Sequence, residues 1–228
     1  MHRLFLVEGG KSVFEVISSD FNIHILLATV DFCNCYQKEL KKKGIKPEIV
    51  EADTLATAGT FESNSAALAI VEMKENKPIH FVGGEFVLVL DDVKDPGNLG
   101  TIIRIADWYG VNNIVCSETS ADCYNPKVIA ASMGSFTRVN IYYTILQQYL
   151  KENRQCAVYG ATLSGKTIYK ERFNKEGFLL MGNESKGISS ELLNFVTEEI
   201  SIPAFGKAES LNVAVATAVI LDNIKRSE

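Results

Sequence analysis

Three polar segments interrupt apolar runs between residues 91 and 213, and their residue types suit a ligand site. They span residues 91–104, 180–187 and 202–213, and they contain glycines, prolines, amides, carboxylates and one arginine. Glycines let the backbone approach a ligand where a side chain would block it, and loops at strand ends carry many binding residues. The composition therefore predicts a ligand site built from three loops.

Arg104 is the residue of the first segment most able to do chemistry. The pattern predicts a helix over 99–109 with Asn98 as its N-cap, because an asparagine side chain can accept from free amides of the first turn. Arg104 then shares a helical face with Gly100 and Thr101, and it points toward the glycine-rich loop. A surface ion pair with a nearby aspartate is the alternative for this arginine.

The other two segments present a carboxylate and an amide at the ends of predicted elements. Glu184 follows a buried strand, at the end where α/β sheets form ligand contacts. A first-turn acid of a helix over 189–196 is its alternative role. Ser210 is predicted as the N-cap of the last helix, and Asn212 in the first turn needs a polar partner. A ligand or substrate is one such partner.

Composition and charge limit the function classes. The 228 residues are 46% hydrophobic and 22% charged, which is typical of a globular protein. No apolar run approaches the ~20 residues of a membrane span, and the N-terminus lacks the pattern of a signal peptide. Five scattered cysteines predict neither disulfides nor a metal site, so we expect a reduced, cytoplasmic protein.

The net charge of −5 leaves RNA binding open, because a local patch can contact phosphates. One candidate patch, which could equally be a solvated helix end, consists of Lys38, Lys41, Lys42, Lys43 and Lys46.

Apolar runs of strand length alternate with helical patterns along the chain, which predicts an α/β fold with a mainly parallel sheet. In the first part, strands are predicted at 4–8, 23–29, 47–51 and 66–73, with helices at 11–19 and 32–43. In the second part, strands are predicted at 86–91, 113–116, 139–143, 156–162, 178–181 and 200–203. We therefore expect a small α/β domain over 1–75, a linker over 76–85 and a larger α/β domain over 86–228.

The predicted last helix, 211–225, carries no charge from Leu211 to Leu221. Such a helix has no polar face, so it is expected to be buried nearly all round. It belongs either to the core or to a subunit interface.

Taken in order, the three segments resemble the signature motifs of SpoU-type RNA ribose methyltransferases, the TrmH family of the SPOUT superfamily. The matching residues are DPGNLG at 95–100 with Arg104, GNE at 182–184 with Gly187, and IP at 202–203 through Gly206 to SLNV at 210–213. The stretches NPKV at 125–128 and SMGS at 132–135 also match, and residues 4–73 resemble the small α/β substrate-binding domain of such enzymes. The resemblance therefore covers almost the whole chain.

This resemblance implies a substrate-binding domain followed by an α/β catalytic domain with a deep trefoil knot. The implied reaction moves a methyl group from S-adenosylmethionine to a ribose 2′-hydroxyl in ribosomal or transfer RNA. Arg104 would act on that hydroxyl, as a base helped by an RNA phosphate. The residues implied to position it and the substrate are Asn98, Glu184, Ser210 and Asn212. Those implied to contact the cofactor are Gly182, Ile202, Leu211, Thr162 and Gly206. A homodimer with the last helix in its interface is also implied.

Three departures from the family pattern support a rival function. Ser185 stands where a glycine is usual, Ala204 where a methionine is common, and Ala130 where an arginine is often found. They would fit an RNA-binding module whose methyltransferase site has decayed. A second rival is a P-loop NTPase, because residues 160–167 (GATLSGKT) match the phosphate-binding loop formally. The helical segment after that loop is too short for an NTPase, so we expect methyl transfer.

Overall fold

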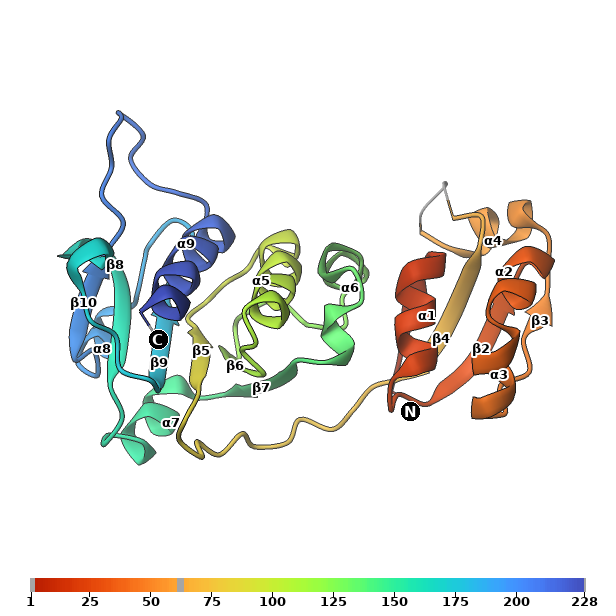
Figure 1. The fold of residues 1–228 in the computed structure, drawn as a ribbon, viewed down its shortest axis with the longest axis horizontal. Coiled ribbons are helices and arrows are strands. Elements are labelled where there is room, and N and C mark those ends of the chain that lie inside the picture. The colour runs from red at the N-terminus through yellow and green to blue at the C-terminus, as the bar shows by residue number, and fades with distance from the viewer. Residues whose placement is uncertain (1–2, 61–63, 228) are drawn as a thin grey trace. The chain divides into compact units, whose positions relative to one another are not determined.

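The computed structural model describes residues 3–60 and 64–227, and these form two compact units (Figure 1). The first unit combines the chain up to Glu75 with the segment Asp122–Arg138. The second combines Asn76–Ala121 with the residues from Val139 onward. The chain therefore leaves the second unit once and returns to it.

The described part of the first unit contains a four-stranded mixed sheet in the order β1-β4-β2-β3. β4 pairs antiparallel with β1 and β2, while β3 pairs parallel with β2. The strands are β1 (Leu4–Glu8), β2 (Ile23–Ala28), β3 (Glu48–Ile49) and β4 (Ala67–Glu72). The helices of the first 75 residues are α1 (Gly10–Ser18), α2 (Val30–Cys35), α3 (Gln37–Lys43) and α4 (Ala52–Ala58). The predicted strands are present, whereas α4 was not predicted.

The prediction of one helix over 32–43 is wrong, because the chain breaks at Tyr36. Tyr36 ends α2 and precedes α3, with φ −113° and ψ 25°. Its ring stacks on Phe14 of α1 with centroids 4.3 Å apart, and it also contacts Phe32 at 4.8 Å. These tertiary ring contacts favour the break over a continuous helix.

The segment 122–138 packs against β1 and α1 through helix α6 (Pro126–Ser132) and the 3₁₀ turn η1 (Ser135–Thr137). Phe5 of β1 lies between Tyr124 and Phe136, with ring centroids 4.6 Å and 5.9 Å away. The hydroxyl of Tyr124 accepts from the backbone N–H of Lys74 at 3.0 Å, and burial raises the pKa of Tyr124 to about 12. These residues were predicted to belong to the domain over 86–228, and their packing differs from that expectation. The boundaries at 75 and 85 stay predictions.

The described part of the second unit contains a six-stranded sheet in the order β10-β8-β9-β5-β6-β7. Each neighbouring pair runs parallel, which confirms the predicted α/β class. The strands are β5 (Phe86–Leu90), β6 (Asn113–Ser117), β7 (Asn140–Thr144), β8 (Val158–Thr167), β9 (Gly177–Met181) and β10 (Glu198–Ser201). β5 and β9, at the centre, are buried along their whole length, as expected of strands covered on both faces.

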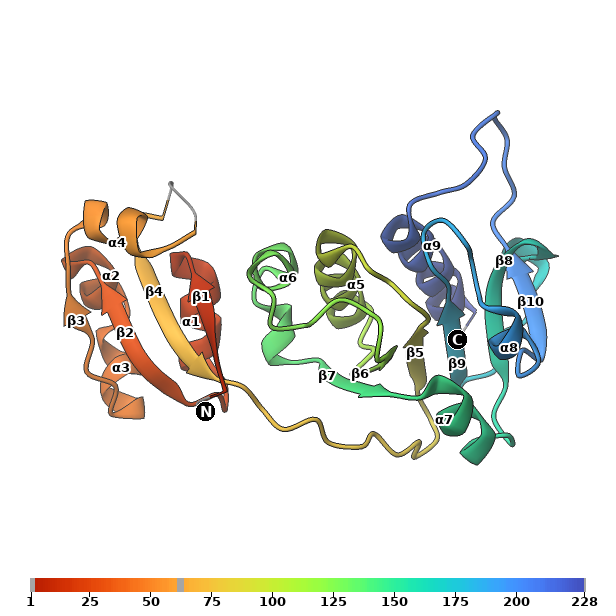
Figure 2. The same ribbon diagram turned by 180° about the vertical axis from the view of Figure 1, so that it is seen from behind.

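Helices cover both faces of this sheet (Figures 1 and 2). The helices and turn are α5 (Pro96–Trp108), α7 (Leu146–Glu152), the 3₁₀ turn η2 (Ile168–Lys170), α8 (Ser190–Leu193) and α9 (Val213–Arg226). α5 and α9 lie side by side on one face. On the other face, Val87, Val89 and Phe178 form a core with residues of α7 and α8. Among the described residues, no helix has the length and apolarity that a membrane crossing requires.

The expectation that the last helix is buried nearly all round is wrong for the single chain. Ile220, Leu221 and Ile224 are buried against the unit, but Val215 is 49% exposed. The cause is geometric: α9 covers one face of the sheet, so its outer surface remains open.

We predict that Phe136→Ala destabilises the first unit by about 3–5 kcal/mol, because Phe136 is only 5% exposed and its truncation leaves a cavity. Urea unfolding followed by circular dichroism measures this loss. The control is Trp108→Ala, which removes a side chain that is 84% exposed and is expected to change stability by less than about 0.5 kcal/mol. Equal effects of the two substitutions would contradict the packing of segment 122–138.

Candidate functional site at the carboxyl edge of the parallel sheet

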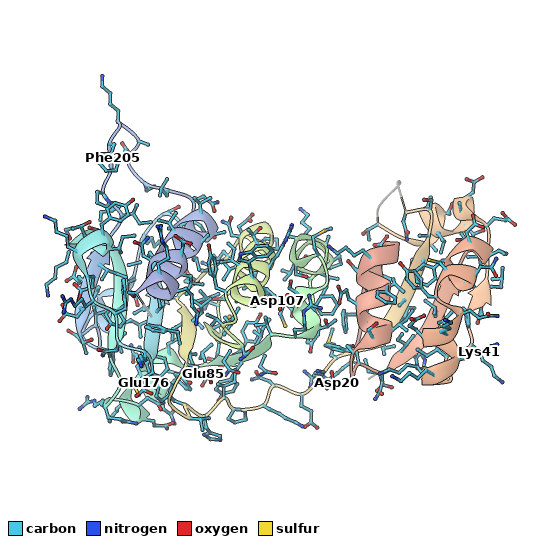
Figure 3. All side chains as sticks on the ribbon, viewed as in Figure 1. Asp20, Lys41, Glu85, Asp107, Glu176 and Phe205 are labelled. Carbon is cyan, nitrogen blue, oxygen red and sulfur yellow. The ribbon has the colours of Figure 1, made fainter. Side chains whose placement is uncertain are left out.

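The predicted functional segments lie at one edge of the second unit's sheet. Since the strands run parallel, the chain segments that leave their carboxyl ends emerge at the same edge. The segments after β5, β9 and β10 are those singled out by composition. The last of them, between β10 and α9, extends from the sheet and carries Phe205, which is 92% exposed (Figure 3).

The side-chain amide of Asn98 connects all three segments. Its Nδ2 donates to Glu184 Oε1 at 3.0 Å, and its Oδ1 accepts from Asn212 Nδ2 at 2.8 Å. One residue thereby links the start of α5, the loop after β9 and the start of α9. Three residues predicted to act together are brought together by direct hydrogen bonds.

The cap residues predicted for both helices need correction. Asp95 is the N-cap of α5, and its carboxylate accepts from the backbone N–H of Asn98 at 2.8 Å. This cap leaves the Asn98 side chain free for its loop contacts. Likewise, Asn212 rather than Ser210 is the N-cap of α9, with its Oδ1 accepting from the N–H of Ala214 at 2.9 Å. An Asp-Pro pair at a helix start is a known signal for this cap, so the sequence did contain the cue for Asp95.

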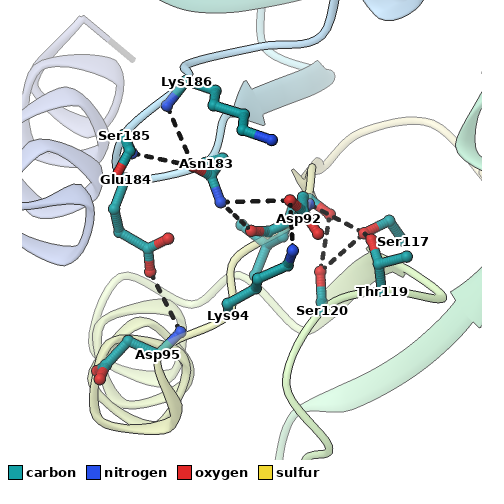
Figure 4. A network of polar contacts seen from close by, with 11 residues as sticks. Asp92, Lys94, Asp95, Ser117, Thr119, Ser120, Asn183, Glu184, Ser185 and Lys186 are labelled. Carbon is teal, nitrogen blue, oxygen red and sulfur yellow. Dashed lines mark hydrogen bonds and ion pairs between the residues drawn. The ribbon is translucent and has the colours of Figure 1, made fainter.

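Asn183 organises the loop after β9 (Figure 4). Its Oδ1 accepts from the N–H groups of Ser185 and Lys186, and its Nδ2 donates to the Asp92 carbonyl at 2.7 Å. Asp92 has φ +58°, a left-handed conformation that is uncommon outside glycine, and its N–H donates to Ser117 Oγ at 2.9 Å. The loops after β5 and β9 therefore fix each other.

The Ser185 departure does not strain this loop. Among the described residues, Asp92 and Met133 are the non-glycine residues with positive φ, so Ser185 avoids that region. Gly187 takes the left-handed conformation instead, with φ +70°, and its N–H donates to the Asn183 carbonyl at 2.9 Å.

Two cavities meet at the loop 183–186. The polar one, of about 690 Å³, is lined by Asp92, Lys94, Asp95, Asn98, Asn183, Glu184, Ser185, Lys186 and Asn212. The larger one, of about 750 Å³, is bounded by β8 and the loops after β9 and β10, with Met181, Ile188 and Val213 among its apolar residues. Both volumes fall in the range of small-molecule sites.

The larger cavity gathers the residues predicted to contact a cofactor. Its lining includes Gly182, Ile202, Leu211, Thr162 and Gly206. Ser210 lines it as well, whereas Asn98 and Asn212 line the polar cavity and Glu184 lines both. The functional roles of these residues stay predictions.

Arg104 lies apart from the other predicted residues. It is exposed on α5, is absent from the lining of either cavity, and makes no hydrogen bond or ion pair with a residue in 3–60 or 64–227. Ile102, Ile103 and Ala106 are buried toward the sheet as predicted, and Gly100 is buried too. The predicted shared face therefore holds for Arg104 and Thr101, which are both exposed, but not for Gly100.

The formal phosphate-binding loop is excluded by its secondary structure. Residues 160–167 lie within β8 instead of turning into a helix. A side chain at Gly165 would overlap the backbone of Glu199 and Ile200, so this glycine permits the close approach of β10. In this motif, Gly165 allows β8 to pair with β10, and an NTPase function has no support.

The parallel sheet and the cavities at its carboxyl edge are typical of α/β proteins that bind ligands at this position. The chain belongs to the SpoU rRNA methylase family, whose sequence profile matches residues 85–222. This finding confirms the family to which the motifs pointed.

The relatives include ribosomal RNA methyltransferases. The chain is 31% identical to the 23S rRNA (guanosine(2553)-2′-O)-methyltransferase RlmP of Bacillus subtilis, over 97% of this chain and 88% of that protein. It is also 31% identical to the 23S rRNA (uridine(2479)-2′-O)-methyltransferase of Streptomyces viridochromogenes, over 97% and 83%. The crystal structure of an AdoMet-bound rRNA methyltransferase from Sinorhizobium meliloti superposes with a TM-score of 0.85 at 29% identity. That match covers 98% of this chain and 87% of the other.

We predict that Gly182→Ala destabilises the second unit by about 1–3 kcal/mol, because the added Cβ would overlap backbone atoms of Gly187 and Ile188. Thermal unfolding measures the change. The matched control is Gly206→Ala, whose Cβ meets no described atom within 4 Å. A Gly182→Ala protein as stable as the control would show that the loop after β9 does not close against this strand end.

Proposed function

We propose that this protein is an S-adenosylmethionine-dependent RNA methyltransferase that modifies a ribose 2′-hydroxyl of 23S ribosomal RNA. The observation that carries the proposal is the pair of cavities joined at the loop 183–186, one largely apolar and one polar. Two relatives that match nearly the full chain are named as 23S rRNA 2′-O-methyltransferases, which favours ribosomal over transfer RNA.

The larger cavity suits S-adenosylmethionine. When bound, this cofactor supplies an electrophilic methyl group on a sulfonium cation. Ile202, Leu211 and Val213 offer apolar surface for its adenosine, and the carboxylates of Glu199 and Glu209 lie in the same lining and attract positive charge. Gly182 lets the backbone at Gly187 and Ile188 pack closely against the end of β9, and these residues form part of the cavity wall.

The polar cavity suits the RNA ribose. Asn98 and Asn212 bring an amide donor and acceptor to its lining, and Glu184 brings a carboxylate that can accept from a hydroxyl. In our proposal these groups orient the 2′-hydroxyl toward the neighbouring cavity. The hydrogen bonds among them keep the three loops in a fixed arrangement before the substrate arrives.

Arg104 takes the role of the residue that acts on the 2′-hydroxyl. A guanidinium in solvent stays protonated, so a role as base requires that RNA or another subunit cover the exposed face of α5. A bound RNA phosphate would also hold the guanidinium by paired hydrogen bonds.

A homodimer would supply such a cover. The outer face of α9 is apolar at Val215, with Ala218 and Val219 only partly buried. A second copy packed on this face would shield it from water and complete each site. The deep trefoil knot, the N-terminal substrate-binding domain and a cytoplasmic location belong to the same proposal.

Methyl transfer tests the proposal directly. The protein is incubated with S-adenosylmethionine carrying a trideuterated methyl group and with ribosomal RNA from a strain that lacks the gene. After digestion to nucleosides, mass spectrometry is expected to find the label on the ribose. Label on a base would refute 2′-O transfer, and cofactor binding without any label in RNA would support the decayed-site alternative.

We predict that Arg104→Ala lowers the rate of methyl transfer by about 10²–10⁴-fold, as expected for loss of an acid–base group. Cofactor affinity measured by calorimetry is expected to change less than twofold, since Arg104 lies outside the larger cavity. Arg172→Ala, which removes an exposed arginine outside both cavities, is the control and is expected to keep full activity. Full activity of Arg104→Ala would eliminate its proposed role.

A further inference from the structure

Two lysines line the polar cavity and are absent from the roles proposed so far; one of them, Lys186, lines the larger cavity as well. Lys94 follows β5, and Lys186 lies in the loop after β9. Figure 4 shows their side chains on either side of Asn183. The backbone N–H of Lys186 donates to Asn183 Oδ1 at 3.1 Å, which fixes where this side chain begins.

The carboxylates of the cavity are held by donors of the protein. Glu184 accepts from Asn98, and the Asp95 carboxylate accepts from the N–H of Asn98. Asp92 accepts from the amide of Asn183 and forms an ion pair with Lys94. These negative charges are therefore engaged with donors of the protein, within a helix cap and within or between the loops.

The lysine ammonium groups, in contrast, retain free hydrogen-bonding capacity. Each ammonium can donate three hydrogen bonds. The Lys94 side chain is 63% exposed and reaches one carboxylate oxygen at 3.3 Å. The Lys186 ammonium makes no hydrogen bond or ion pair with any residue that the structure describes. The two lysines thus bring unused cationic donors to this cavity, and these favour an anionic ligand.

The substrate chemistry supplies such an anion. This step rests on the proposed function, since it concerns how RNA enters the same site. In an RNA chain, a ribose with a free 2′-hydroxyl carries a phosphodiester on the adjacent carbon. Any RNA that presents its 2′-hydroxyl at Asn98 and Glu184 therefore brings a phosphate to the same cavity.

We infer that Lys94 and Lys186 bind a phosphodiester adjacent to the ribose that is methylated. Lysine suits this role because it binds phosphate as a point charge on a flexible chain. The two ammonium groups would hold the RNA backbone in register, while the amide and carboxylate groups orient the hydroxyl. Lys94 and Lys186 are positioning residues in this account.

Salt dependence of RNA binding tests the inference. The probe is ribosomal RNA from a strain that lacks the gene, and the variants are Lys94→Ala, Lys186→Ala and the double substitution. Each single variant is expected to raise the RNA dissociation constant. The logarithm of the RNA binding constant falls linearly with the logarithm of the KCl concentration. Each lysine removed is expected to make this slope about one unit less steep. Lys94→Arg and Lys186→Arg are expected to restore the slope.

Cofactor affinity and a distant lysine serve as controls. The dissociation constant of S-adenosylmethionine is expected to stay within twofold in Lys94→Ala, because Lys94 lines the polar cavity and not the larger one. Lys186 lines both cavities, so circular dichroism is the folding control for Lys186→Ala and for the double variant. Lys151→Ala removes an exposed lysine of α7 outside both cavities and is expected to leave the slope unchanged.

Two results would overturn the inference. One is an unchanged salt slope and unchanged RNA affinity in the double variant. The other is a loss of cofactor affinity in Lys94→Ala equal to its loss of RNA affinity, which would assign Lys94 to loop structure. A wild-type protein that transfers no methyl group to this RNA would instead refute the proposed function itself.

Discussion

The amide of Asn98 is the contact on which the candidate site depends. An asparagine side chain donates and accepts at the same time, and Asn98 uses both ends, toward Glu184 and toward Asn212. A carboxylate at this position could not donate, and an apolar side chain could do neither. Because Asn98 lies in the first turn of α5 and Asn212 caps α9, the contact also joins the starts of two helices that pack together.

The hydrogen bonds around this amide hold the loops that form two adjacent cavities of different polarity. The loop 183–186 separates them, and Asn183 holds that loop against Asp92. In the proposed function, the apolar surface on one side serves the cofactor. On the other side, donors, carboxylates and lysines are available for a ribose and its phosphate. A reaction between two such ligands requires this adjacency, which places reacting groups within reach of each other.

The sequence was sufficient to predict the features that depend on local pattern. Unbroken apolar runs predicted β5 and β9, and the glycine-rich segments after the strands predicted where the cavities lie. Features that depend on distant contacts were missed or misassigned. Tyr36 breaks a helical pattern through ring contacts with Phe14 and Phe32, and no local signal announces those partners. Packing of Phe136 and Tyr124 on Phe5 assigns 122–138 to the first unit for the same reason.

The helix caps are an intermediate case. Asp95 could have been predicted from the Asp-Pro pair, which would have left Asn98 free for its loop contacts. The role of Asn183 could not, because its partners in the Asp92 turn are 91 residues away in the chain. For Arg104, the sequence predicted a position away from the core, and the structure agrees. The predicted face shared with Gly100 is not found, because Gly100 is buried and Arg104 lines neither cavity. Its chemical role depends on what covers α5, which one chain alone does not contain.

A double-mutant cycle on Asn98 and Asn212 tests most directly whether the site acts as one connected unit. The substitutions are Asn98→Ala and Asn212→Ser, since serine preserves the helix cap but is too short to reach Asn98. The measurement is kcat/KM for methyl transfer in the wild type, both single variants and the double variant. We predict a coupling energy of about 0.5–3 kcal/mol, with the double variant hardly slower than the worse single one. If the two losses simply multiply, the hydrogen bond between these amides does not organise the site and the central claim is wrong.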